Sequence, residues 1–236
     1  FSTLNYNSEI MKIGIIVAMQ KELDLLLPLV KDYKSRTVND ITLYEGQMGD
    51  NSLTIMQCGI GKVNAAIGAM TLIDAARPDL VINSGVAGGT GYGAKILDVV
   101  VGDRVAYHDV WCGPCGVPRG CVQGMPQYFE APVEVVGSKV FDREGVKRGL
   151  IASGDQFVDS VESLAAIKDI YPEVMAVDME SAAIAQACYL KGVPFVSIRV
   201  ISDTPGEADN SAQYASFWDD APRHTFDLLV SLLETI

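Results

Sequence analysis

The chain has 236 residues, of which 49% are hydrophobic and 20% charged, which is ordinary for a globular protein long enough to bury a large core. Its formal net charge of −12 argues against a nucleic-acid partner, because binding to a phosphate backbone needs clustered Lys and Arg side chains. No apolar run approaches the roughly 18 residues that a membrane span requires, so we expect no membrane partner.

The first ten residues show neither a helical nor a strand period, and Met11 resembles a natural start. We therefore expect residues 1–10 to be an N-terminal extension or an expression remnant, and residues 11–236 to form a single domain. The apolar segment 13–19 is too short for a secretory signal, and the odd number of cysteines, five, fits reduced thiols better than a disulfide framework. These features predict a cytoplasmic protein.

Strands and helices alternate along the first part of the chain. Residues 12–17 are almost continuously apolar and rich in β-branched side chains, which predicts a central strand, and a helix follows from about residue 18. Residues 42–46 and 53–58 predict an antiparallel hairpin, and a helix opens at the glycine-rich turn of residues 59–62. This turn lacks the spacing of a phosphate-binding P-loop.

The same alternation continues to the C-terminus, apart from one stretch between residues 110 and 132 that has four Gly, four Pro and no period. The alternation of strands and helices argues for a three-layer α/β/α domain around a mixed, mainly parallel sheet. The predicted strands are 80–85, 103–107, 149–153, a short run containing 176–177, and 193–201; the predicted helices begin at about 161, cover 181–190 and lie within 212–236.

Polar or glycine-rich junctions follow three of these strands, at residues 85–89, 178–180 and 202–203. Parallel strands would bring such junctions to one edge of the sheet, where open α/β sheets bind ligands. Taken alone, Asp178 and Glu180 are explained as well by the following helix, whose N-terminus stabilises carboxylates by a few tenths to about 1 kcal/mol. The recurrence of unusual junctions favours a functional site.

A more specific signal comes from six segments in order, which are residues 13–22, 59–63, 84–89, 153–157, 177–180 and 199–203. Together they resemble the 5′-methylthioadenosine/S-adenosylhomocysteine nucleosidases of the nucleoside phosphorylase superfamily, from about residue 11 to the C-terminus. The resemblance implies a hydrolase that cleaves the N-glycosidic bond of both nucleosides, with 5′-deoxyadenosine as a further candidate substrate. It would release adenine and a 5-thio-substituted ribose in methionine salvage, with no cofactor and no metal.

The resemblance also implies a role for each polar residue. Cleavage builds positive charge on the sugar and negative charge on the base, so the leaving adenine needs an acid near its N7 atom. Asp203 matches that acid, and burial at the end of an apolar strand would raise its pKa. Ser202 would orient Asp203, Glu22 matches the base that activates water, and Glu180 matches the residue that binds the ribose 2′- and 3′-hydroxyls.

The remaining predicted site residues are apolar or contribute backbone. The resemblance places two of them at the purine and one against the sugar, and an apolar wall would suit an uncharged 5′-thioether. Core packing is the alternative explanation for four of them, Met19, Ile60, Phe157 and Met179. In the glycine-rich strand end, backbone amides can approach a ligand, although Val86 stands where some relatives carry Ser. These residues are Met19, Ile60, Val86, Ala87, Gly88, Phe157, Val158 and Met179.

In the family, the loop that corresponds to residues 110–132 reaches into the neighbouring subunit's pocket and covers the 5′ group. The resemblance therefore implies a homodimer. Here the sequence of the loop diverges after Asp109, so the preferred 5′ substituent stays open.

Two competitors share the fold. An aminodeoxyfutalosine nucleosidase differs chiefly in the 5′ group of its substrate, which the sequence does not decide. A purine nucleoside phosphorylase would need Arg donors for phosphate, but Asn83 stands where phosphorylases carry Arg, and Glu22 stands where they carry a basic residue. Hydrolysis is favoured. We interpret Arg199 as a structural ion-pair donor.

Three alternative functions belong to other classes of protein: a thiol redox protein, a zinc protein and a pure binding module. Residues 111–115 match a thioredoxin active-site pentapeptide, which would need Cys112 at a helix N-terminus, yet Gly and Pro follow. A zinc site could use His108, Cys112, Cys115 and Cys121, although a second close cysteine pair is missing. A pure binding module would release no adenine from methylthioadenosine.

Overall fold

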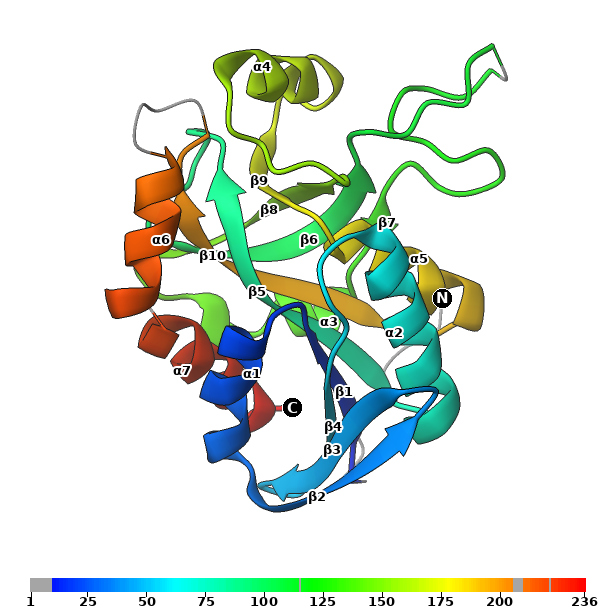
Figure 1. Ribbon diagram of the computed structural model, residues 1–236, viewed down its shortest axis with the longest axis vertical. Coiled ribbons are helices and arrows are strands. Elements are labelled where there is room, and N and C mark those ends of the chain that lie inside the picture. Colours follow the sequence, from blue (N-terminus) through cyan, green and yellow to red (C-terminus); the bar gives the residue numbers. More distant parts are fainter. Residues whose placement is uncertain (1–9, 115, 206–209, 221) are drawn as a thin grey trace.

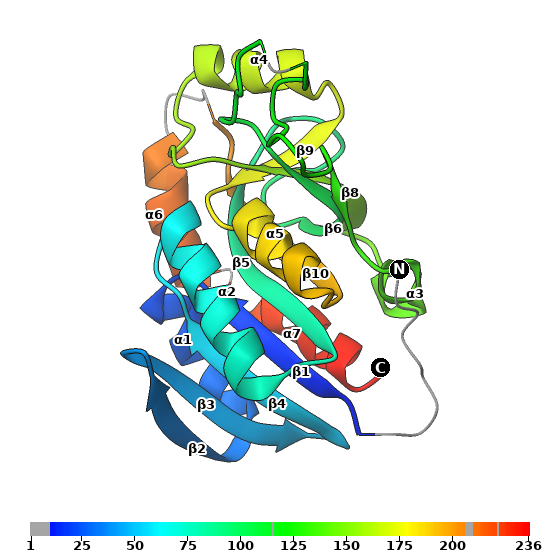
Figure 2. The same ribbon diagram turned by 90° about the vertical axis from the view of Figure 1, so that its right-hand side faces the viewer.

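A mixed β-sheet lies between two layers of helices in the computed structural model of the chain, which describes residues 10–114, 116–205, 210–220 and 222–236 (Figures 1 and 2). The predicted three-layer α/β/α architecture is confirmed. One face carries α1 (Gln20–Leu26), α6 (Asn210–Asp220) and α7 (Pro222–Leu233); the other carries α2 (Lys62–Ala76) and α5 (Ser181–Lys191); α4 (Val161–Ile170) lies at one end.

Parallel pairings run through the centre of the sheet and join β4, β1, β5 and β10, while a second parallel set joins β6, β8 and β9. Antiparallel pairings link the two sets and add the edge strands β3 and β2. The strands are β1 (Lys12–Val17), β2 (Lys31–Val38), β3 (Ile41–Met48), β4 (Asn51–Gln57), β5 (Leu80–Gly89), β6 (Val99–Tyr107), β7 (Phe129–Glu130), β8 (Val146–Ser153), β9 (Val174–Asp178) and β10 (Phe195–Asp203).

Three hydrophobic clusters lie among the described residues, and the two larger ones cover opposite faces of the central strands. Along β1 the side chains alternate between them, as strand geometry requires. Ile13, Ile15 and Val17 join the core under α1 and α7, whereas Ile16 joins the core under α2 and α5. Burial on both faces explains why this strand is apolar almost without interruption.

The structure differs from the expected elements at the edges. Strand β2 was not predicted, because its charged residues leave most of it exposed at the edge of the sheet. The C-terminal stretch forms two helices, α6 and α7, and Pro222 occupies the first position of the second. Short helical turns lie at Leu27–Leu29, Val133–Val136 and Lys139–Phe141.

Two expectations concern the chain as a whole. Residues 1–9 of the predicted extension lie outside the described residues. Within the described part of the chain, no helix has the length and apolar character that crossing a membrane demands.

Candidate active site

The ends of β1, β5, β9 and β10 meet at a cavity of about 370 Å³, a size suited to a small molecule. All the catalytic and substrate-binding residues implied by the nucleosidase resemblance line it. They come from segments far apart in the chain, as expected for strand ends at one edge of a sheet. The lining includes Met19, Glu22, Ile60, Val86, Ala87, Gly88, Phe157, Val158, Met179, Glu180, Ser202 and Asp203.

Asp203 is placed by an irregularity in β10. Ile201 pairs with Ala87 of β5, but Asp203 pairs with Gly88, so Ser202 is an extra residue at this point of the strand. Such bulges redirect side chains next to active sites. Asp203 is only 2% exposed and accepts a hydrogen bond from the Ser202 hydroxyl at 2.6 Å. Burial raises its pKa and the Ser202 hydrogen bond opposes the shift, so the carboxyl group is suited to hold a proton.

Glu22 lies in the first turn of α1 and folds back on the chain that precedes it. Its Oε2 atom accepts hydrogen bonds from the amides of Ala18 at 2.8 Å and Met19 at 2.9 Å, and its Oε1 atom accepts one from Val86 at 3.3 Å. The side chain is 1% exposed, and burial raises the pKa of Glu22 while Arg199 and the three amides oppose the shift. A carboxylate held in this way is a stronger base than one in water.

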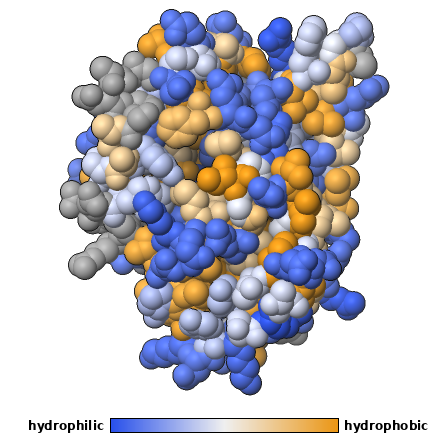
Figure 3. Space-filling model, in the orientation of Figure 1, coloured by the Kyte–Doolittle hydropathy of each residue, from blue (hydrophilic) through white to orange (hydrophobic). Residues whose placement is uncertain are grey.

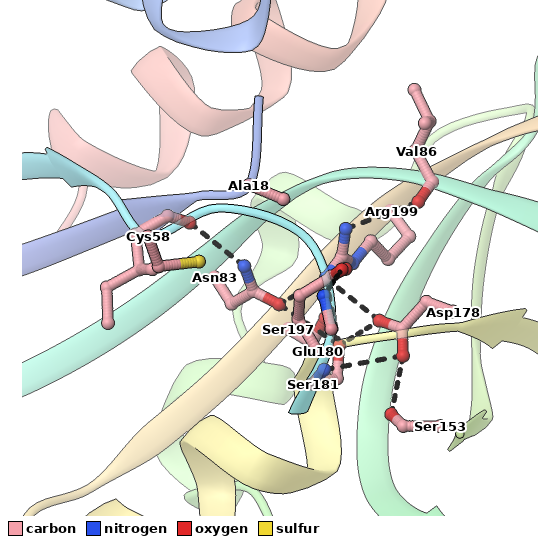
Figure 4. A network of polar contacts seen from close by, with 12 residues as sticks. Ala18, Cys58, Asn83, Val86, Ser153, Asp178, Glu180, Ser181, Ser197 and Arg199 are labelled. Atoms are coloured by element: carbon pink, nitrogen blue, oxygen red, sulfur yellow. Dashed lines mark hydrogen bonds and ion pairs between the residues drawn. The ribbon is translucent and has the colours of Figure 1, made fainter. Parts of the chain in front are cut away.

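Arg199 connects the acidic residues beneath the cavity (Figure 4). One of its terminal nitrogens lies 2.9 Å from the Asp178 carboxylate and 3.4 Å from that of Glu180. The other donates to the carbonyl oxygen of Val86 at 3.2 Å. Arg199 is 1% exposed, so its charge requires these partners, and the predicted ion-pair role is confirmed.

Glu180 stands between this network and the cavity. Its Oε1 atom accepts a hydrogen bond from the Gly61 amide at 3.0 Å, and its Oε2 atom faces Arg199. Burial raises the pKa of Glu180, and the charge of Arg199 opposes the shift. Both oxygens are therefore fixed in direction by groups from other elements, which is the condition for binding a pair of hydroxyls specifically.

Hydrophobic side chains form the rest of the wall. Ile60 is 52% exposed and Phe157 46%, so both stand at the mouth, and the core-packing explanation for Ile60 is wrong. Tyr214 of α6 also lines the cavity, and the sequence pattern did not predict it. Its ring meets that of Phe157 edge-on at 5.8 Å, and its hydroxyl donates to the sulfur of Met19 at 3.3 Å. The helical spacing of apolar residues in the C-terminal stretch does not distinguish Tyr214 from its neighbours, so its place at the cavity is seen only in the fold.

The structure also bears on the two alternatives that involve cysteine, a thiol redox protein and a zinc protein. Cys112 lies in neither a helix nor a strand, so it lacks the helix N-terminus that a thioredoxin-like thiol uses. Cys115 lies outside the described residues. Among those that are described, no group of three or more His, Cys, Asp or Glu side chains could hold a metal ion.

Asn83 occupies the position where a phosphorylase would need a cation. It is fully buried in β5, its amide nitrogen donates to the Ile16 carbonyl at 2.9 Å, and its oxygen accepts from Arg199 and Ser181. Its polar atoms are thus engaged inside the protein, and the only guanidinium among the described lining residues, that of Arg199, pairs with carboxylates.

Comparison with known proteins gives a consistent set of similarities. The family model described as "Phosphorylase superfamily" matches residues 12–234. A 5′-methylthioadenosine/S-adenosylhomocysteine nucleosidase of Actinobacillus succinogenes is 38% identical over 227 residues, which is 94% of this chain and 98% of that protein.

Solved structures agree with this. The S-adenosylhomocysteine nucleosidase from Streptococcus pyogenes, in complex with 5-methylthiotubericidin, has a TM-score of 0.91 at 35% identity over 98% of this chain and 99% of that one. The futalosine hydrolase of Helicobacter pylori has a TM-score of 0.89 at 28% identity, with 96% and 99% covered.

Proposed function

Because the chain belongs to the phosphorylase superfamily, and within it to the 5′-methylthioadenosine/S-adenosylhomocysteine nucleosidases, we propose that it hydrolyses the N-glycosidic bond of these two nucleosides. The products are adenine and the corresponding 5-thio-substituted ribose, as methionine salvage requires. The observation that carries the proposal is the pair of buried carboxyl groups, Glu22 and Asp203, on the wall of one largely apolar cavity.

Asp203 is the proposed acid. As the glycosidic bond breaks, negative charge develops on the adenine ring, and protonation at N7 neutralises it. A carboxyl group can donate only while it is protonated, and the raised pKa of Asp203 keeps it so at a higher pH than in water. Ser202 holds its oxygen in place. Phe157 and Val158 are the proposed contacts of the purine.

Glu22 is the proposed base. It takes a proton from a water molecule that attacks the anomeric carbon, so the two carboxyl groups work as in inverting sugar hydrolysis. Glu180 binds the ribose 2′- and 3′-hydroxyls, and Met179 packs against the sugar. The apolar residues Met19 and Ile60 suit an uncharged 5′-thioether.

The decisive experiment is incubation with methylthioadenosine and quantification of free adenine by chromatography, with and without inorganic phosphate. We expect adenine release at the same rate in both, and phosphorus NMR should detect no ribose 1-phosphate. Formation of that ester would make the protein a phosphorylase, and the absence of adenine release would make it a binding module.

The structural likeness to a futalosine hydrolase favours one alternative on the same fold, an aminodeoxyfutalosine nucleosidase. Both activities use the same base and sugar contacts, so the 5′ group decides between them. Comparing kcat/KM for methylthioadenosine, S-adenosylhomocysteine, 5′-deoxyadenosine and aminodeoxyfutalosine ranks them directly.

Three further proposals concern the whole protein. Residues 11–236 form one domain, in line with a family match over residues 12–234. The protein is cytoplasmic, in keeping with free thiols at Cys58, Cys112, Cys121 and Cys188. It is a homodimer, for which exposed hydrophobic side chains on α2 and α5 provide a surface.

A further inference from the structure

A ring of contacts joins three segments just outside the cavity. Lys62 begins α2, Asp109 follows β6, and Asp155 lies in the turn after β8. The ammonium of Lys62 donates to both carboxylate oxygens of Asp109, at 2.8 and 2.7 Å. Its backbone amide donates to Asp155 Oδ1 at 2.7 Å, and the amide of Asp155 donates to Asp109 Oδ2 at 2.8 Å, which closes the ring.

Each side of the ring continues directly into the cavity wall. On the side of Lys62, the preceding amide, that of Gly61, donates to Glu180 Oε1, and Ile60 lines the mouth. On the side of Asp155, the next residues are Gln156 and Phe157, which also line it. The proposed sugar contact and the proposed base contact therefore belong to two turns that the ring ties together.

Within the ring, the ion pair between Lys62 and Asp109 is better protected than an ordinary surface ion pair, whereas the side chain of Asp155 is 48% exposed. The side chains of Lys62 and Asp109 are 22% and 24% exposed, and the ammonium also lies 5.4 Å from the centre of the Tyr107 ring. The pair between Lys191 and Asp74 has the same 2.7 Å separation, but its side chains are 35% and 63% exposed and it joins helices α5 and α2 away from the cavity.

We propose that Lys62 and Asp109, neither of which lines the cavity, are positioning residues for nucleoside binding. Their ion pair holds the turn of residues 59–62 close to the turn of residues 154–157. It thereby keeps Glu180 and Phe157 in the positions in which both can contact the same nucleoside. The inference rests on the proposed function, because it assigns the sugar and the base to these two side chains.

The test compares Lys62→Met, which removes the charge and keeps the chain length, with Lys62→Arg, which keeps the charge. We expect KM for methylthioadenosine to rise about tenfold in Lys62→Met, while kcat changes less than about threefold. Without the ion pair, Glu180 and Phe157 would bind the sugar and the base less well, in the ground state and the transition state alike. Lys62→Arg should recover most of the affinity. Asp109→Asn should behave like Lys62→Met, and the double variant should be no worse than either single one.

Amide hydrogen exchange of the unliganded proteins gives a readout that does not depend on catalysis. Peptides covering 59–62 and 154–157 should exchange faster in Lys62→Met and Asp109→Asn than in the wild type. In the control Lys191→Met, neither their exchange nor KM should change.

Normal exchange in both turns together with an unchanged KM would overturn the positioning role. The positioning role would also be overturned if the variants lost thermal stability and exchanged faster along the whole chain. That pattern would show that the ion pair stabilises the fold as a whole. If the wild type releases no adenine, the proposed function fails, and the exchange measurement still decides whether the ring couples the two turns.

Discussion

At the scale of single residues, the site contains carboxyl groups that share deep burial but differ in their neighbours. Glu22 receives three backbone amides and faces Arg199, all of which favour the carboxylate. For Asp203, a hydrogen bond from the Ser202 hydroxyl opposes the effect of burial on its pKa. Two carboxyl groups in different environments can hold different protonation states at one pH, which is how an acid and a base coexist in a site.

Asp203→Asn tests the acid. The variant keeps the shape of the side chain but has no proton to transfer, so kcat should fall about 10²- to 10⁴-fold with little change in KM. The wild-type kcat should fall as pH rises through the raised pKa of Asp203, because the protonated form is the active one, and the variant should lose this limb. Adenine release measured across pH checks both. Asp98→Asn, at a buried aspartate outside the cavity, is the control, and a variant with near-normal kcat would remove Asp203 from the mechanism.

Residue types were easier to predict than partners. The sequence places Asp178, Glu180 and Arg199 at strand ends, but it does not say which carboxylate meets the guanidinium. In the structure both do, and Asp178 also accepts hydrogen bonds from the hydroxyls of Ser153 and Ser181. The partners of these charged groups depend on how β8, β9 and α5 pack together, and no local sequence pattern predicts this packing.

At the scale of elements, the site depends on close approach between strands. Gly85 in β5 pairs with Arg199 in β10, and a methyl group on Gly85 would overlap both the Arg199 guanidinium and the Glu22 carboxylate. The glycine-rich strand end was predicted to leave room for a ligand. At this position its nearest neighbours are the protein's own charged groups.

Gly85→Ala should therefore damage the site as well as the fold. We expect it to cost about 1–3 kcal/mol of unfolding free energy, because neither buried charged group can move without losing partners. Activity per folded molecule should fall with it. Gly14→Ala is the control: a methyl group there would meet the flexible end of Leu72, remote from the cavity, so stability should fall and kcat should not. Denaturant titration and turnover, measured on the same samples, separate the two effects.

The segment of residues 110–132 shows how little a count of apolar side chains says about where they pack. The family resemblance implies that this segment reaches into the neighbouring subunit's pocket. In the structure, Phe129 is buried against Tyr107 and Tyr189, and Val122 and Met125 pack on the core. Trp111 remains 65% exposed, with the Arg119 guanidinium 5.2 Å from its ring. Packing of this kind depends on tertiary contacts, which a count of apolar residues does not distinguish from an interface.

At the scale of the whole molecule, strand periodicity was sufficient for the architecture, because buried parallel strands are continuously apolar wherever they occur. The surface is a separate matter. Figure 3 shows hydrophobic side chains over α2. Two residues of this helix, Val63 and Ile67, are 68% and 54% exposed. Tyr189 of the adjacent α5 is 55% exposed. Exposed apolar side chains gathered on neighbouring helices favour an interaction site.

The homodimer proposal predicts that this face is the interface. A two-fold interface uses the same patch of both subunits, so Val63→Glu would bury one unpaired carboxylate from each subunit and should shift the protein to monomers at micromolar concentration. Analytical ultracentrifugation measures the shift. Val161→Glu is the matched control, because Val161 is 61% exposed on α4, away from α2 and α5, and that variant should sediment like the wild type. A Val63→Glu variant that sediments as the wild-type dimer would place the interface elsewhere, and a wild type that is monomeric throughout would rule out the dimer itself.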